Sequence, residues 1–334
     1  MGKVTIKDIA AMLKTSPKTV SKALNNKPGV SRELRERIRQ KARELNYVPN
    51  IFGRGLSGKS SKTIGVIITD NTNPMYSLIL NELEQEAAKL DYTMILCNSH
   101  GDLLQEQKLI HVLLERRVEG VIIRPVDTPE ASQNLNILQR SDVPYTVINR
   151  LIPGQEQFCI RPNNFRAAYL AGAYLLEKGH QRIIHLTRRD SVSEAEERID
   201  GLRQVFAGHG RAAFHDTDIY RRCRVNVESA YQEMLGILRE RSDFSAVFAY
   251  NDIMAFGVMK AVYECRLRIP TDVAIMGVDN LMFSDVSLVP LTTVNHNLRA
   301  VGAIALTALL NKIQRRDEPL PAVPEPYIVE RQSV

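Results

Sequence analysis

The sequence predicts two folded parts, a small all-α helix-turn-helix domain followed by a two-lobed α/β domain with parallel sheets. The first 61 residues carry 14 Lys and Arg against 4 Asp and Glu, a net charge of +10 in a chain whose total is +6. From Thr63 onward, β-rich runs alternate with helical stretches, a pattern typical of parallel sheets covered by helices. Between these parts lies a Gly-, Ser- and Pro-containing stretch, residues 49–61, that is typical of a connector.

Composition limits the class of protein. The chain has 334 residues, of which 44% are apolar and 25% charged, as in soluble multidomain proteins. It has neither an apolar signal core nor an apolar run long enough to span a bilayer, so we expect a cytoplasmic protein. Four scattered cysteines without CxxC spacing predict no metal, no cofactor and no disulfide framework.

The N-terminal domain, residues 1–48, contains three helix-start signals. Thr5 with Asp8 fits a capping box, Ser16 before Pro17 is a second cap, and Ser31 is a third. The predicted helices are 6–13, 17–24 and 32–45. Two short helices joined by a tight turn and braced by a third are typical of a helix-turn-helix, whose second helix enters the DNA major groove. The alternative is a basic helical hairpin that contacts protein.

A specific resemblance favours DNA. The matching segments are Val4-Thr5-Ile6-Lys7-Asp8-Ile9-Ala10, Ser16-x-x-Thr19-Val20-Ser21-x-x-Leu24-Asn25, Val30-Ser31 and Leu45-Asn46-Tyr47-x-Pro49-Asn50. Together they resemble the opening of the LacI/GalR family of bacterial transcription regulators. The resemblance implies sequence-specific binding of a near-palindromic double-stranded operator by a homodimer.

The resemblance also implies individual DNA contacts. Ser16, Thr19, Ser21 and Asn25 would bind phosphates or set orientation, Pro17, Lys18 and Lys22 would read bases, and Thr5 and Ser31 would lie at the same surface. Phosphate contacts carry most of the affinity, whereas base contacts select the sequence. Two residues depart from the family pattern: Lys14 stands where the family has Gly in the turn, and Lys22 where it has Arg.

In the resembled family the connector is a hinge that becomes helical on operator DNA. Asn50 and Arg54 would contact DNA there, and Leu56 would enter a base step from the minor groove, a contact that bends the duplex. Gly53 and Gly55 replace better helix formers, so we hypothesise that operator affinity depends strongly on hinge ordering. The alternative is a plain disordered linker.

The α/β part, residues 62–334, contains two series of alternating elements. The first series is 63–69, 75–90, 93–98, 104–116, 120–124, 130–141 and 145–149, and the second is 165–178, 182–187, 195–207, 227–240, 246–250, 253–265 and 273–278. Landmarks such as Asn251-Asp252-x-Met254-Ala255-x-Gly257 resemble the periplasmic-binding-protein fold of the family's effector domain. We therefore expect one lobe at about 62–161 and 292–321, including Thr292–Val294 and a helix at 298–313, and the other at 162–291.

Ligands of such folds bind at the carboxyl ends of the strands. The polar residues expected there are Asn73, Tyr76, His100, Arg124, Asn149, Arg150, Arg198, Asn251, Asp279 and His296. By family position Arg198 and Asp279 have the strongest support. For Asn251, helix capping is an equal alternative.

Several arginines fall near the expected cleft. Arg124, Arg150 and Arg198 would carry guanidinium groups there, which suits an anionic effector such as a sugar acid or a sugar phosphate. Arg188 and Arg189 either join them or form a solvated loop pair.

Three function classes remain. The leading hypothesis is a ligand-controlled transcription regulator, in which a sugar-type effector shifts the balance between two conformations. A solute-binding protein of sugar transport would share the α/β part but has no use for residues 1–61. An enzyme is the weakest alternative, because no nucleotide-binding, nucleophile or metal-site motif occurs.

Overall fold

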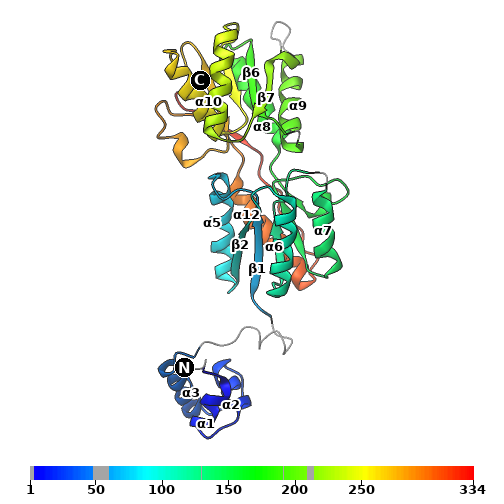
Figure 1. Cartoon of the computed structure of the whole chain (residues 1–334), viewed down its shortest axis with the longest axis vertical. Helices are drawn as coiled ribbons and strands as arrows, with labels where there is room; N and C mark the ends of the chain where they lie inside the picture. The colour runs from blue at the N-terminus through cyan, green and yellow to red at the C-terminus, as the bar shows by residue number, and fades with distance from the viewer. Residues whose placement is uncertain (1–3, 48–59, 129, 191, 209–213) are drawn as a thin grey trace. The chain divides into compact units, whose positions relative to one another are not determined.

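The computed structural model describes residues 4–47, 60–128, 130–190, 192–208 and 214–334. The chain forms two compact units, Met1–Ser61 and Lys62–Val334, each of which is described here by itself (Figure 1). Within the described ranges, no helix has the length and apolar character needed to cross a bilayer.

The first unit is a three-helix domain, as predicted. Its helices are α1 (Ile6–Met12), α2 (Pro17–Leu24) and α3 (Arg32–Glu44). Small and β-branched side chains from all three helices form the core, among them the fully buried Ile9, Val20 and Ile38. The side chains of Thr5, Ser16 and Ser31 cap the three helices by accepting backbone N–H bonds. The capping signals in the sequence are therefore confirmed.

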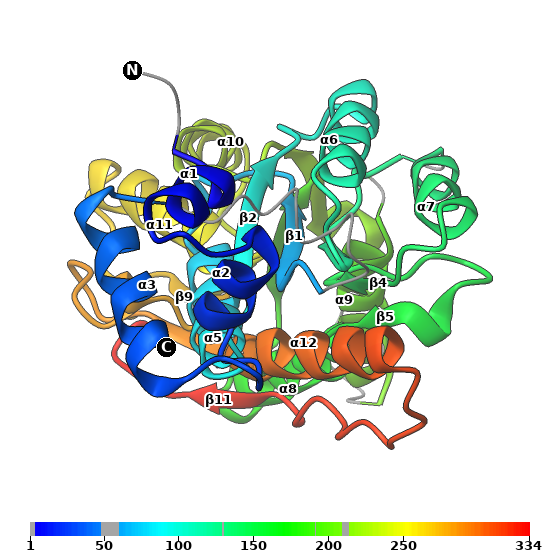
Figure 2. The ribbon, with the colours of Figure 1, turned by 90° about the horizontal axis from the view of Figure 1, so that it is seen from below.

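The first lobe of the second unit contains a five-stranded parallel sheet in the order β2-β1-β3-β4-β5. Its strands are β1 (Thr63–Ile68), β2 (Thr93–Asn98), β3 (Gly120–Ile123), β4 (Tyr145–Ile148) and β5 (Cys159–Ile160). Its helices are α5 (Met75–Lys89), α6 (Leu103–Glu115), α7 (Ala131–Arg140) and α12 (Leu298–Gln314). Helices α5 and α12 cover one face and α6 and α7 the other, as Figure 2 shows.

The second lobe contains a six-stranded sheet in the order β11-β10-β9-β8-β6-β7, parallel except for β11. Its strands are β6 (Ile183–Arg188), β7 (Ile219–Cys223), β8 (Ala246–Ala249), β9 (Ala274–Val278), β10 (Thr292–Asn295) and β11 (Tyr327–Val329). Its helices are α8 (Asn164–Glu177), α9 (Ser193–Ala207), α10 (Val227–Glu240) and α11 (Asp252–Glu264). Helices α8 and α9 pack on one face, α10 and α11 on the other.

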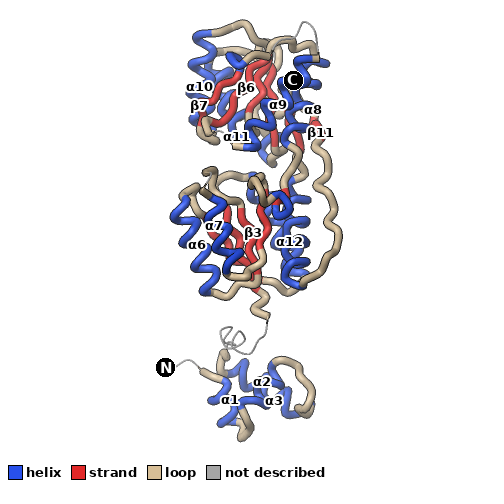
Figure 3. Tube along the Cα trace, turned by 90° about the vertical axis from the view of Figure 1, so that its right-hand side faces the viewer, coloured by secondary structure: helices blue, strands red, loops and turns tan. Residues whose placement is uncertain are grey.

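The expectation that Thr292–Val294 returns to the first lobe is wrong. These residues form β10, which pairs in parallel with β9 and antiparallel with β11 in the second lobe. The following helix, α12, packs in the first lobe, as does the partly buried Val323 beyond it. The remaining chain then runs along the side of this unit to β11, as Figure 3 shows. A strand of only four residues, such as β10, gives no sequence signal for which of two sheets it will join.

Candidate functional site

The recognition surface of the three-helix unit begins at the first turn of α2. Ser16 accepts a hydrogen bond from the backbone N–H of Thr19 at 3.1 Å, and Pro17 occupies the first helical position. Pro17 and Lys18 are exposed, so both are free of the core. Lys22 lies one turn further along α2 and is half-buried. This geometry presents one apolar and one cationic side chain at the end of a helix, as a major-groove reader does.

The other predicted DNA contacts in the three-helix unit lie on or beside its helix ends. Thr5, Ser16 and Ser31 are exposed caps, and Thr19, Ser21 and Asn25 are partly exposed along α2 and just after it. Asn25 donates to the backbone oxygen of Ser21 at 2.7 Å, which fixes its side chain. Asn50, Arg54 and Leu56 lie outside the described residues, as do most of the hinge residues 49–61.

The turn between α1 and α2 contains one of the two departures from the family pattern, Lys14. Lys14 has a φ of +48°, in the left-handed region that glycine adopts most readily. The lysine therefore holds this conformation at the steric cost of its Cβ, a cost that glycine at the same position would not have.

Between the two lobes lies a cavity of about 780 Å³. Nine of the ten residues predicted from strand ends line it, namely Asn73, Tyr76, His100, Arg124, Asn149, Arg198, Asn251, Asp279 and His296. Arg150 does not line the cavity, because its guanidinium is bound to Asp127 and to backbone oxygens beside it. The volume suits a mono- or disaccharide-sized ligand.

Three non-glycine residues of the cavity wall have a positive φ. His100, Asn149 and Asp279 directly follow strands β2, β4 and β9 or lie within two residues of them, and their φ angles are +54°, +48° and +115°. Non-glycine residues hold such angles only where the surrounding structure fixes them, and they gather at functional sites. The strained turns aim short polar side chains into the space between the lobes.

Four buried polar atoms of the cavity wall have no hydrogen-bond partner in the described part of the chain: Asn149 Oδ1, Arg188 Nε, Asp279 Oδ2 and His296 Nε2. Buried polar groups are rarely left unpaired, so their position points to a ligand that supplies hydrogen-bonding groups. Burial lowers the pKa of His296 well below its usual range, and its ring is therefore neutral near pH 7. A neutral imidazole nitrogen can donate to or accept from a hydroxyl group.

Arg198 and Asp279 form a loosely opposed pair in this wall. Arg198 donates to Asn164 Oδ1 from Nε and Nη2 at 3.2 and 2.9 Å, and to the backbone oxygen of Tyr250 from Nη1. These partners are uncharged. Burial, opposed by Arg198, raises the pKa of Asp279 to about 8, so this carboxyl can donate as well as accept near neutral pH.

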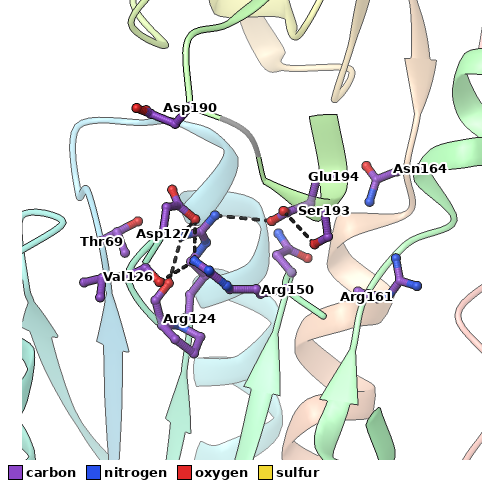
Figure 4. A network of polar contacts seen from close by, with 12 residues as sticks. Thr69, Arg124, Val126, Asp127, Arg150, Arg161, Asn164, Asp190, Ser193 and Glu194 are labelled. Atoms are coloured by element: carbon purple, nitrogen blue, oxygen red, sulfur yellow. Dashed lines mark hydrogen bonds and ion pairs between the residues drawn. The ribbon is translucent and has the colours of Figure 1, made fainter. Parts of the chain in front are cut away.

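Four charged residues that line the cavity, two from each lobe, link the lobes, and Figure 4 labels three of them, Arg124, Asp127 and Glu194. Arg124 of the first lobe contacts Glu194 of α9 at 3.2 Å, and Arg188 at the end of β6 contacts Asp127 of the first lobe at 2.8 Å. Asp127 Oδ1 also contacts Arg124 at 2.5 Å and Arg150 at 2.7 Å. Burial acts against ionisation, but Arg124 and Arg188 outweigh it and lower the pKa of Asp127.

Arg188 and Arg189, the arginine pair at the end of β6, differ in exposure and in partner. The side chain of Arg188 is 12% exposed and points to the first lobe, so it belongs to the cleft. The side chain of Arg189 also lines the cavity, but it is 53% exposed and contacts the exposed Asp190 of the same loop. Asn251 Oδ1 caps α11 by accepting from the backbone N–H of Met254 at 3.0 Å, and the residue also lines the cavity.

Four residues of the site escaped the sequence reasoning. Asp127 and Tyr250 follow strands β3 and β8 closely, so the strand-end signal could have found them. Glu194 and Asn164 lie in the first turns of α9 and α8, where a polar residue is ordinary, and only the fold brings them to the cavity.

Both parts of the chain match known protein families. Residues 5–50 match the family described as bacterial regulatory proteins, lacI family, and residues 61–324 match the periplasmic binding proteins and sugar binding domain of LacI family. The chain is similar to the HTH-type transcriptional repressor PurR of Vibrio atlanticus (strain LGP32), with 30% identity over 99% of this chain and 98% of the relative.

Two further relatives match most of the chain. The ribose operon repressor of Escherichia coli (strain K12) is 30% identical over 92% of this chain and 93% of its own length. The crystal structure of the lac repressor dimer bound to operator and the anti-inducer ONPF superimposes with a TM-score of 0.87 at 26% identity, covering 99% of both chains.

Proposed function

The chain belongs to the LacI family of bacterial regulatory proteins, and we propose that it is a transcriptional repressor whose operator affinity is controlled by a small carbohydrate-type effector bound between its two lobes. The observation that carries the proposal is the convergence of nine predicted polar residues on one cavity, in a chain that also has a capped helix α2. Binding at the cavity and binding at α2 are then two coupled equilibria.

The cavity wall supports a hydroxyl-rich effector. Asn149 Oδ1 can accept from a ligand hydroxyl, Asp279 can donate or accept, and the neutral ring of His296 can do either. A ring carrying several hydroxyls satisfies all three positions, whereas an apolar ligand would leave them unpaired. Asn73, Tyr76 and His100 complete the first-lobe wall.

The predicted DNA contacts divide by chemistry. We assign the exposed Lys18 and Pro17 to base edges, and the hydroxyl and amide groups of Ser16, Ser21 and Asn25 to phosphates. Lys22 lies one turn further along α2 and is half-buried, so we assign it a smaller contribution to base recognition than Lys18. The assignment rests on the resemblance of this segment to the family pattern, and the exposure of Pro17 and Lys18 supports it.

A second copy of the chain is the proposed protein partner. The surface of the second lobe exposes Tyr263 by 68%, Phe283 by 48%, Val286 by 75% and Leu288 by 77%, and all four line one broad apolar groove. Exposed apolar area of this kind is typical of an interface. The similar lac repressor structure is described as a dimer on operator, which supports pairing of two recognition helices on a near-palindromic site.

Operator selection from random DNA tests the proposal, with the full chain and a panel of neutral and acidic sugars. We expect a near-palindromic consensus and at least one sugar that changes affinity for it. As a matched pair, Lys18→Ala should lose the consensus and Asp279→Ala should keep it while losing the sugar response. Equal affinity for all DNA sequences, with and without every sugar, would contradict the proposal.

A further inference from the structure

We propose that Glu194 determines the charge class of the effector: by neutralising Arg124 from across the cleft, it makes the cavity selective for an uncharged carbohydrate over sugar acids and sugar phosphates. The inference rests on the proposed function, because it concerns the ligand of the same cavity. It replaces the hypothesis of an anionic effector, which counted the arginines of the sequence without the carboxylates that the fold brings to them.

The geometry at Arg124 leaves little room for a ligand anion. Its side chain is 6% exposed, and that of Glu194 is 8% exposed. Arg124 Nη2 contacts Glu194 Oε1 at 3.2 Å, while Nη1 donates to the backbone oxygen of Pro125 at 2.8 Å and contacts Asp127 at 2.5 Å. Both terminal nitrogens of this guanidinium are therefore already bound to oxygen atoms of the protein.

Glu194 is itself held in place. Ser193 donates from Oγ to Glu194 Oε2 at 3.1 Å, so the two carboxylate oxygens have separate partners (Figure 4). An anionic group entering at Arg124 would have to displace this carboxylate into a water-poor space. The displaced charge would then lack a cation, and burying an unpaired carboxylate is strongly unfavourable.

The cavity wall as a whole has no excess of arginines over carboxyl groups. Five arginines line it, Arg124, Arg188, Arg189, Arg198 and Arg224, together with six acidic residues, Asp70, Asp127, Asp190, Glu194, Glu228 and Asp279. Asp127 is shared by three guanidinium groups, since Arg150 contacts it from beside the cavity. Removing the charge of Glu194 would leave Arg124 with only this shared carboxylate, and an anion could then take the vacated position.

Inorganic phosphate is the first probe, because it needs no knowledge of the natural effector. The full-length wild type, Glu194→Gln and Glu196→Gln are compared by calorimetry and thermal shift at constant ionic strength. Glu196 lies on the same helix, but its carboxylate pairs with Arg221 at 2.6 Å and does not line the cavity. Glu194→Gln should bind phosphate about tenfold to a hundredfold more tightly than either other protein, as one charge-assisted hydrogen bond allows.

Matched sugars are the second probe. D-Ribose is compared with ribose 5-phosphate, and D-glucose with D-glucuronate, on the wild type and both variants. The wild type should prefer the neutral member of any pair that binds, and Glu194→Gln should shift the preference toward the anion by about tenfold or more. Far-UV circular dichroism checks that each variant is folded. If Glu194→Gln does not fold, the preference of the wild type between the neutral and the anionic sugar tests the inference.

Three results would overturn the inference: a wild type that prefers the anionic sugars, a Glu194→Gln protein without added phosphate affinity, or an equal gain in Glu196→Gln. Failure of the proposed function is a different outcome. In that case no sugar of either charge changes operator binding, while the phosphate comparison still reports on the role of Glu194.

Discussion

Arg188 in the second lobe and Asp127 in the first form an ion pair across the cleft, with 2.8 Å between Nη2 and Oδ2. Arg124 and Glu194 form a second pair with the polarity reversed. Each lobe thus contributes one cation and one anion, and the chain's own side chains hold the lobes together without a ligand. The proposed effector would therefore bind in a cleft whose two walls already contact each other.

The first prediction concerns this link. Asp127→Asn should lower the free energy of unfolding by about 2–4 kcal/mol, because three guanidinium groups lose the carboxylate they share and the site is only partly screened by solvent. It should also increase the radius of gyration in small-angle scattering, since the lobes separate. Asp190→Asn is the control: Asp190 also contacts Arg188, but its side chain is 50% exposed, and its loss should cost less than about 1 kcal/mol. Equal effects of the two variants would contradict a structural role of the cross-lobe pairs.

The second prediction concerns base recognition. Lys18→Ala should weaken operator binding by about 1–3 kcal/mol and relax the sequence preference at one base pair, because an exposed cation at the start of α2 is lost. Lys41→Ala is matched in charge, but Lys41 pairs with Glu44 on α3. Binding titrations on consensus and mutated operators separate the two. If both variants lose affinity equally on all sequences, Lys18 contributes only charge.

The third prediction concerns the strained turn. Lys14→Gly should stabilise helices α1 and α2 by about 0.5–1 kcal/mol, because glycine adopts a φ of +48° without a Cβ penalty. Hydrogen exchange of the amides in these helices, in the full chain, measures the gain. Lys14→Ala removes the same charge but keeps a Cβ, so it should give no such gain. A similar gain from alanine would assign the effect to charge instead.

The fourth prediction concerns pH. Burial raises the pKa of Asp279 to about 8, so the folded protein binds this proton more tightly than the unfolded chain does. The resulting stability is present at acid pH and is lost as pH rises toward 8. Between pH 5.5 and 8, the free energy of unfolding should fall in the wild type because Asp279 loses its proton. In Asp279→Asn the fall should be smaller by at least about 1.4 kcal/mol, the equivalent of one pKa unit. Denaturant titrations of the wild type and of Asp279→Asn at the two pH values measure the difference.

The fifth prediction concerns the connector and rests on sequence alone. Replacing Gly53 and Gly55 by Ala should tighten operator binding, because each glycine disfavours a helix by about 1 kcal/mol and a dimer contains four of them. Operator affinity of the double variant is the measurement. An unchanged or weaker affinity would reject the idea that hinge ordering limits binding.

Local signals in the sequence were sufficient for much of this architecture. The three caps follow from Ser and Thr before apolar periodicity, and the cavity residues follow from polar positions after buried strands. Both signals are local, so neighbouring residues are enough to detect them. The two-residue strand β5 and the strands β7 and β11 gave no comparable signal, because they are short or mixed in polarity.

Long-range pairing was beyond the sequence. Arg124 was found as a strand-end residue, but Glu194 is 70 positions away and meets it only when the lobes approach. The same limit explains the misplaced β10, whose partner strand β11 lies more than thirty residues further along the chain. The charge of the ligand therefore cannot be inferred from the arginines alone. Without Glu194 beside it, Arg124 suggests an anionic effector, whereas the pair suggests an uncharged one.

The pairing of β10 with β9 and β11 also sets the order of assembly during synthesis. Ser333 donates to the backbone oxygen of Ile275 at 2.6 Å and accepts from the backbone N–H of Thr292 at 2.8 Å, so the last residues complete a sheet begun at β6. While the ribosome is still translating α12, strand β10 has an unpaired edge. The sheet of the second lobe is therefore complete only after residues 327–334 have been synthesised, and a fragment that stops at residue 291 would expose the edge of β9 to aggregation.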